Sequence, residues 1–128
     1  MPLPFPAFKP CPCGSGRSYG VCCGPLHAGE REAATPEELM RSRYAAYALR
    51  DTGYVRRTWH PETCPPDLDL GDDDARYTGL TVHRAKGDEV TFTATLRVGG
   101  RTHRLRERSI FVRLDGRWVY VSGVTPGE

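Results

Sequence analysis

The sequence predicts an α+β fold, in which helices pack on one face of a curved antiparallel meander sheet behind a short cysteine-rich knot. Three observations support this prediction. Apolar residues recur at helical spacing within residues 36–58, they alternate with polar residues from residue 77 onward, and four of the five cysteines lie within residues 11–23. A chain of 128 residues has room for one ordinary core and an appendage.

The clearest helix signal begins at Thr35. This residue is a favourable N-cap, Pro36 suits the first helical position, and Glu38 completes a capping box with Thr35. The helix should extend from residue 36 to about residue 50. Arg43 falls in the middle of its apolar face, where a buried guanidinium must find a hydrogen-bond acceptor. The apolar positions of that face are Leu39, Met40, Tyr44 and Tyr47.

A second, shorter helix is predicted over residues 52–58. Asp51 can cap it, and His60 ends it because the residue before a proline avoids helical angles. Residues 61–76 form a loop rich in proline and aspartate. Its aspartates lack the glycine and terminal glutamate of an EF-hand, which favours a solvated loop over a calcium site. These aspartates are Asp67, Asp69, Asp72, Asp73 and Asp74.

Apolar and polar residues alternate along the second half of the chain, which predicts β-strands. The first strand begins at residue 77 and ends at a turn over residues 86–88. The others cover residues 90–98, about 101–114 and 118–122. Gly99-Gly100 and Asp115-Gly116 are hairpin turns, the latter with the signature of type I′. Four consecutive strands with short turns make an antiparallel meander.

The third predicted strand carries one carboxylate on an otherwise apolar face. Glu107 alternates there with Leu105, Ser109 and Phe111. If this face meets the helices, Glu107 is partly buried and needs a partner. We therefore predict an ion pair between Arg43 and Glu107 that joins helix to sheet.

The cysteines of residues 11–23 form a C-x-C pair and a C-C pair separated by eight residues. Four thiolates at short range suit a closed, tetrahedral, structural zinc site, although iron or cadmium could fill the same site. A pair of disulfides is the second interpretation, and redox chemistry is the third. Nothing in the sequence indicates an oxidising compartment, and no βαβ unit follows, so zinc is favoured. The remaining Cys64 stands alone beside Pro65.

The stretch C-P-C-G-S-G-x-x-Y-x-x-C-C resembles the SEC-C motif, named for the zinc-binding tail of the SecA translocation ATPase. The resemblance implies one zinc ion bound by four cysteines. Tyr19 could contact a partner, but we expect it to pack under the zinc loop, and we expect the nearby His27 to be a surface or capping residue. The implied ligands are Cys11, Cys13, Cys22 and Cys23.

The rest of the chain resembles the YchJ-like proteins. The resemblance rests on residues 39–44 (LMRSRY), on residues 58–61 (TWHP), on Glu107-x-Ser109-x-Phe111 and on residues 116–118 (GRW). In that uncharacterised family a SEC-C knot precedes a domain similar to nuclear transport factor 2, whose fold is cone-shaped. The resemblance implies a knot over residues 1–30 and an α+β domain over residues 31–128.

Composition excludes several classes of protein. The net charge of +2 and the pI of about 8.3 lack the strong basic field typical of nucleic-acid binders. No apolar run reaches the roughly 18 residues of a membrane span. The N-terminal residues 1–8 are apolar but interrupted by prolines and without a basic region, so a strap is expected there and not a signal peptide. These features predict a cytoplasmic protein.

Three functional hypotheses remain, of which a docking module is the first. Because the SEC-C tail of SecA docks onto other macromolecules, the resemblance implies that the knot does the same here. The partner would be another protein or a ribonucleoprotein. Lys9 and Arg17 are the candidate contact residues on the knot.

The second hypothesis places a small molecule in the cone of the fold, which is an argument from fold analogy. The sequence shows no nucleophile beside a base, so binding is favoured over catalysis. The candidate cavity residues are Arg43, Tyr44, Trp59, His60 and Glu107.

The third hypothesis is contact with nucleic acid or the ribosome through an arginine-rich face of the sheet. The low net charge instead favours a solvated face. Its candidate residues are Arg104, Arg106 and Arg108, with Arg17 on the knot and with Arg97, Arg101 and Arg113 on adjoining strands.

Overall fold

The computed structural model describes residues 5–71 and 74–125 of the chain. Asp72 and Asp73 of the predicted acidic loop lie outside the described residues, as do the first four residues of the predicted strap. Within the described ranges, the helices are too short or too polar to cross a membrane. The elements are a 3₁₀ helix η1 (Tyr19–Val21), then α1 (Gly24–His27), α2 (Pro36–Ala48), α3 (Thr52–Arg57), β1 (Arg76–Lys86), β2 (Glu89–Val98), β3 (Arg101–Leu114) and β4 (Arg117–Val124).

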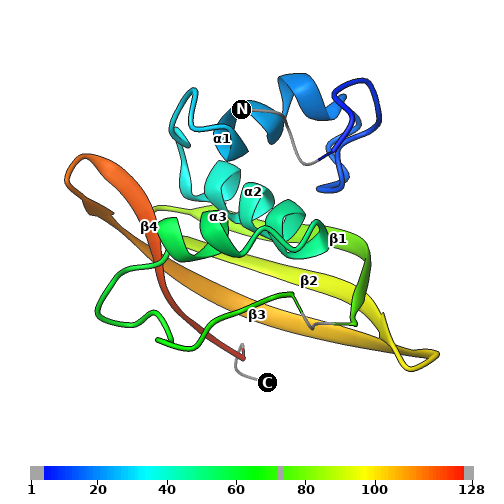
Figure 1. The fold of residues 1–128 in the computed structure, drawn as a ribbon. Helices are drawn as coiled ribbons and strands as arrows, with labels where there is room; N and C mark the ends of the chain where they lie inside the picture. Colours follow the sequence, from blue (N-terminus) through cyan, green and yellow to red (C-terminus); the bar gives the residue numbers. More distant parts are fainter. Residues whose placement is uncertain (1–4, 72–73, 126–128) are drawn as a thin grey trace.

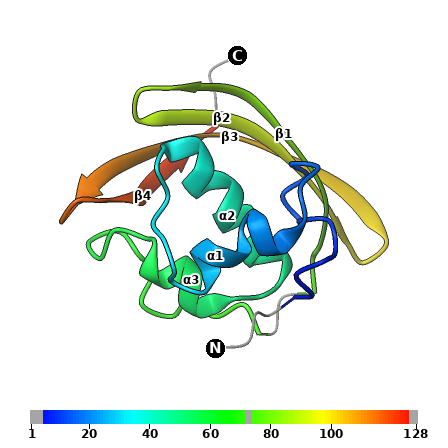
Figure 2. The ribbon, with the colours of Figure 1, turned by 90° about the horizontal axis from the view of Figure 1, so that it is seen from above.

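The four strands form one antiparallel sheet in the order β1-β2-β3-β4, which confirms the predicted meander. The two residues of the β3–β4 turn have positive φ angles, 53° at Asp115 and 83° at Gly116, as a type I′ hairpin requires. Register shifts occur twice in the β1–β2 pair and once between β3 and β4. Such bulges bend strands, and Figure 2 shows the sheet curving around the helices.

Helix α2 crosses the concave face of the sheet, and the knot lies on the side of α2 that faces away from the sheet (Figure 1). Its N-terminus is capped as predicted, because the backbone N–H of Glu38 donates to Thr35 Oγ1 at 3.1 Å. The carboxylate of Glu38 returns to the N–H of Ala34 instead of to that of Thr35. Because α2 touches the sheet on one side and the knot on the other, a single apolar cluster contains residues of both.

Helix α3 ends where the chain pairs with the last strand of the sheet. The N–H of Tyr120 donates to the carbonyl of Thr58 at 2.8 Å, and the N–H of His60 donates to the carbonyl of Tyr120 at 2.7 Å. These two bonds form a short parallel bridge between Trp59 and Tyr120, whose rings meet edge to face. The bridge joins the end of α3 to β4.

Arg43 points inward as expected, but the predicted ion pair with Glu107 is wrong. Its Nη1 donates to the carbonyl of Val55 at 3.0 Å and to Thr58 Oγ1 at 2.8 Å. Its guanidinium also lies 4.9 Å from the ring centroid of Trp59 and 4.4 Å from that of Tyr120. The ion pairs within the described ranges join Arg31 to Glu38, Arg41 to Glu37 and Arg108 to Glu89.

His27 joins the knot to helix α2. It is buried, so the prediction of a surface position is wrong. Residues 24–27 form α1, a helix that is not predicted from the sequence. The Nε2 of His27 lies 2.8 Å from the carbonyl oxygen of Ser42 in α2, and its Nδ1 lies 2.5 Å from the hydroxyl of Tyr19. Burial lowers the pKa of His27, so the neutral ring donates to Ser42 and accepts from Tyr19.

Replacing Arg43 by lysine should destabilise the protein by about 1–3 kcal/mol, since an ammonium has no planar surface to contact the rings while donating to both Val55 and Thr58. Arg41→Lys is the matched control, because Arg41 forms a part-exposed ion pair in the same helix and its change should cost less than about 1 kcal/mol. Urea unfolding measures both. Equal losses would show that the stacking of Arg43 contributes nothing specific.

Removing the ring nitrogens of His27 should weaken the attachment of the knot. In His27→Phe the packing against Tyr54 is kept, but Tyr19 and the carbonyl of Ser42 lose a buried hydrogen-bond partner, at a cost of about 1–3 kcal/mol. A double-mutant cycle with Tyr19→Phe, in samples of equal metal content, isolates the pair. Additive losses of unfolding free energy in the cycle would contradict the coupling.

Candidate metal centre and cavity

The first two cysteines are presented by a tight loop closed at its ends. The N–H of Cys11 donates to the carbonyl of Arg17 at 2.9 Å, and Pro10 pairs with Ser18 as an isolated antiparallel bridge. Gly14 and Gly16 have φ angles of 77° and 87°, a left-handed conformation that side chains disfavour. The glycines of the C-x-C-G-S-G stretch therefore allow the loop to return on itself.

The other two cysteines lie between η1 and α1. The N–H of Cys22 donates to the carbonyl of Tyr19 at 3.1 Å, and Cys23 immediately precedes α1. The side chain of Tyr19 is fully buried, which confirms its expected place under the loop. Its ring meets that of Phe5 edge to face, with centroids 5.5 Å apart, so part of the N-terminal strap covers the knot.

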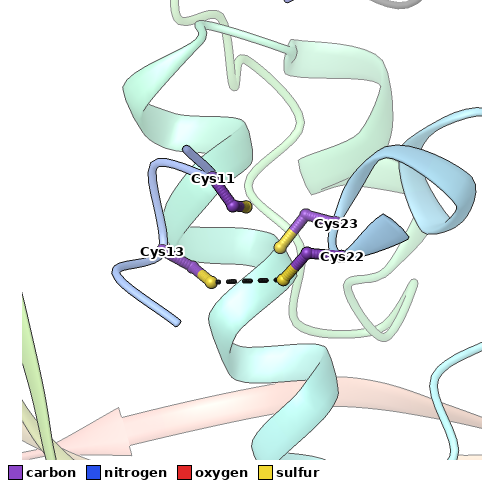
Figure 3. A group of neighbouring side chains, drawn as sticks. All are labelled: Cys11, Cys13, Cys22 and Cys23. Carbon is purple, nitrogen blue, oxygen red and sulfur yellow. Dashed lines mark hydrogen bonds between the residues drawn. The ribbon is translucent and has the colours of Figure 1, made fainter. Parts of the chain in front are cut away.

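The four sulfur atoms converge on one point. One ligand atom from each of Cys11, Cys13, Cys22 and Cys23 lies within 4.8 Å of the others, and Figure 3 shows the side chains turned toward one another. The Sγ atoms of Cys13 and Cys22 are 3.6 Å apart. Zinc–sulfur bonds of about 2.3 Å give a tetrahedral edge of about 3.8 Å, so the donor set fits a tetrahedral thiolate-bound metal ion. All five cysteines are unbridged.

Polar and cationic groups surround the cysteines. The hydroxyl of Ser15 lies 3.1 Å from the Sγ of Cys22, and Arg41 donates to the carbonyl of Cys13 at 3.3 Å. Arginine side chains beside a group of thiolates favour the charged, metal-binding form. His27 is not a fifth ligand, since both of its ring nitrogens have other partners.

A cavity of about 200 Å³ lies between α2 and the sheet. Of the predicted cavity residues, Arg43, Tyr44 and Glu107 line it. Trp59 and His60 are outside its lining: Trp59 stacks behind Arg43, and the Nδ1 of His60 accepts the N–H of Glu62 at 3.1 Å. The remaining wall residues are Met40, Tyr47, Tyr77, Phe92, Ala94, Leu105, Ser109, Phe111 and Tyr120.

Glu107 is held within the cavity by two hydroxyl groups. Its Oε2 accepts from Ser109 Oγ at 2.6 Å and from the Tyr120 hydroxyl at 3.2 Å. Ser109 and Tyr120 are not among the cavity residues predicted from the sequence. The alternation of β3 does place Ser109 on the face of Glu107, but the facing of Tyr120 depends on the bulge between β3 and β4.

Three of the candidate arginines lie on β3, away from the knot. Arg104, Arg106 and Arg108 are exposed, and each pairs in register with a threonine of β2. Arg108 forms an ion pair with Glu89, with 3.6 Å between its Nε and the Oε1 of Glu89. Arg17 is on the knot, which packs on the helix side of the sheet, so it does not join this group (Figure 1).

Comparison with known families gives two matches. The SEC-C motif matches residues 9–25, which contain the four converging cysteines. The YchJ middle domain, described as NTF2-like, matches residues 35–123, from the start of α2 into β4. Both resemblances of the sequence, and the α+β fold that they imply, are confirmed.

Relatives of similar length share much of the sequence. A UPF0225 protein of Deinococcus radiodurans is 67% identical over 118 residues, which cover 91% of this chain and 90% of the relative. A UPF0225 protein of Ralstonia nicotianae is 53% identical, with 96% and 95% covered.

Two solved structures have the same architecture. The solution structure of RPA3114, a SEC-C motif containing protein from Rhodopseudomonas palustris, superposes with a TM-score of 0.81 at 41% identity, covering 91% of this chain and 98% of the other. A crystal structure of a SEC-C motif containing protein from Psychrobacter arcticus gives 0.71 at 21% identity, covering 95% and 85%, and shows the fold alone. The chain therefore belongs to the UPF0225 family, in which a SEC-C motif precedes a YchJ-type domain of the NTF2-like fold.

Proposed function

We propose that this protein is a docking module whose SEC-C knot is ordered by one structural zinc ion and presents a contact surface to a partner protein. The observation that carries the proposal is the gathering of exposed apolar and cationic side chains on the knot. Phe8 is 81% exposed and Val21 is 56% exposed, and Lys9 and Arg17 lie beside them. We call these four residues the knot surface.

The backbone holds the two halves of the knot surface together. The N–H of Tyr19 donates to the carbonyl of Lys9 at 2.8 Å, and the N–H of Gly20 donates to that of Ala7 at 2.9 Å. A Cβ on Gly20 would come 2.8 Å from that of Ala7, so glycine permits this close approach. The side chain of Arg17 meets the carbonyl of Val21. The chain segment before the cysteines is thus fixed against η1.

Zinc supports this arrangement energetically. The knot segment is too short to pay its ordering entropy from apolar burial, and metal binding to four thiolates supplies on the order of 10 kcal/mol in small zinc domains. A closed set of four ligands leaves no coordination position for substrate, which favours a structural over a catalytic ion.

The chemistry of the knot surface suits a protein partner with an apolar pocket beside acidic side chains. Phe8 is the apolar anchor, because a large exposed aromatic ring gains most when buried in an interface. Lys9 and Arg17 would add charge complementarity, which sets orientation and association rate.

Metal analysis should find one zinc ion per chain. Cys13→Ser should abolish stoichiometric zinc binding and disorder residues 5–30, whereas Cys64→Ser should keep both the metal and the order, since Cys64 is remote from the cluster. Mass spectrometry of the metal and amide NMR spectra measure these effects. A purified protein without metal, whose knot amides stay unchanged after a chelator is added, would contradict the zinc assignment.

The double variant Phe8→Ser/Val21→Ser should lose the partner that the unmodified protein captures from its own cell lysate, while its zinc content stays the same. Val124→Ser is the matched control, because Val124 is 42% exposed at the far end of β4. Cross-linking followed by mass spectrometry identifies the partner. Identical capture by all three proteins would exclude the knot surface, and loss of the partner on RNase treatment would replace a protein partner by RNA.

A further inference from the structure

We propose that the cavity between α2 and the sheet binds a small organic cation, with an apolar body and an ammonium head that pairs with Glu107. The inference concerns a different surface from the docking proposal and does not rest on it. It rests on three observations. These are the hydrogen bonds that orient the carboxylate, the aromatic side chains in the cavity wall, and the hydrogen bonds that Arg43 donates to Val55 and Thr58.

The carboxylate of Glu107 is oriented with one oxygen committed and the other available. Both of its hydrogen bonds end on Oε2, and within residues 5–71 and 74–125 none ends on Oε1. Burial, and then the charge of Glu107, raise the pKa of Tyr120, so its hydroxyl stays protonated and donates. Both hydroxyl groups donate to the same oxygen, so they fix the orientation of the carboxylate.

The strand opposite Glu107 leaves room for this carboxylate. A Cβ at Gly123 would lie 2.1 Å from Glu107 Cδ, 2.2 Å from its Oε2 and 2.7 Å from its Cγ. The φ angle of Gly123 is not in the left-handed region, so backbone conformation does not require glycine there. The absence of a side chain is what lets Glu107 occupy its position.

Aromatic side chains form half of the cavity wall. Ring faces carry negative electrostatic potential and attract organic cations, which is how aromatic cages recognise ammonium groups. A carboxylate within such a wall adds a full counter-charge. The rings are those of Tyr44, Tyr47, Tyr77, Phe92, Phe111 and Tyr120.

Arg43 is the opposing charge at the cavity, and its Nη1 is turned toward α3. The rings of Trp59 and Tyr120 lie beside its guanidinium, with centroids 4.9 Å and 4.4 Å from Cζ. Its Nη1 donates to Val55 and Thr58 on the side of α3. The ring of Tyr120 contacts Arg43, while its hydroxyl bonds Glu107. Oε1 of Glu107 accepts no hydrogen bond from the residues that the structure describes, so this oxygen can receive the ammonium head of a ligand.

Three probes of nearly equal size test the charge preference: benzylamine, benzyl alcohol and benzoate. Each is titrated to millimolar concentration into the full-length, metal-loaded protein and followed by amide NMR shifts. Benzylamine should shift the amides of Phe92, Ala94 and Ser109 and bind at least fivefold more tightly than benzyl alcohol, with benzoate weakest. Equal or tighter binding of benzoate, or no shift with any probe, would overturn the proposal.

Two variants assign the preference to the carboxylate. Glu107→Gln keeps the size and the Oε acceptor, and it should reduce benzylamine affinity about tenfold while leaving benzyl alcohol within twofold. Gly123→Ala keeps the charge but displaces the carboxylate, and it should give a similar loss. Glu89→Gln is the matched control, because Glu89 pairs with Arg108 away from the cavity.

Unchanged benzylamine binding in Glu107→Gln, or an equal loss in Glu89→Gln, would refute a role for Glu107. Circular dichroism checks that each variant is folded, and Glu107→Gln decides the question if Gly123→Ala does not fold.

Discussion

The position of Arg43 is the constraint on which the arrangement of helices and sheet depends. Burial lowers the pKa of Arg43, yet a guanidinium keeps its charge in proteins, so the fold has to supply acceptors and aromatic faces around it. It does so from α3 and from β4, which the bridge between Trp59 and Tyr120 holds side by side. One side chain of α2 thereby fixes how the second helix and the last strand meet.

Much of this architecture could be predicted from the sequence, because local chemistry determines it. Asp115-Gly116 favours one hairpin type, and Thr35 with Pro36 marks the start of a helix. The partner of Arg43 could not be predicted in this way. Its acceptors are a backbone carbonyl and the hydroxyl of Thr58, and a carbonyl is present at every position, whereas a lone glutamate on a facing strand is conspicuous.

The same limitation explains His27. A histidine just after a metal-binding motif gives no sign of whether it faces solvent or the body, since its partners are the hydroxyl of Tyr19 and the carbonyl of Ser42, the latter 15 residues away. The structure shows that His27 connects the knot to α2. The four cysteines differ, because they are close in the sequence and the loop between them turns at Gly14 and Gly16, so their convergence could be predicted.

Glu107 can receive a ligand because it does not form an ion pair with Arg43. A carboxylate bonded directly to Arg43 would be neutralised and closed to a ligand. Here Tyr120 stands between the two, stacking on the cation and donating to the anion, so the charges are balanced across a ring and remain separate. That separation requires Gly123, because any larger residue would push Glu107 out of its place beside the hydroxyl groups. A purely structural pair would need neither the intervening ring nor the empty space on β4.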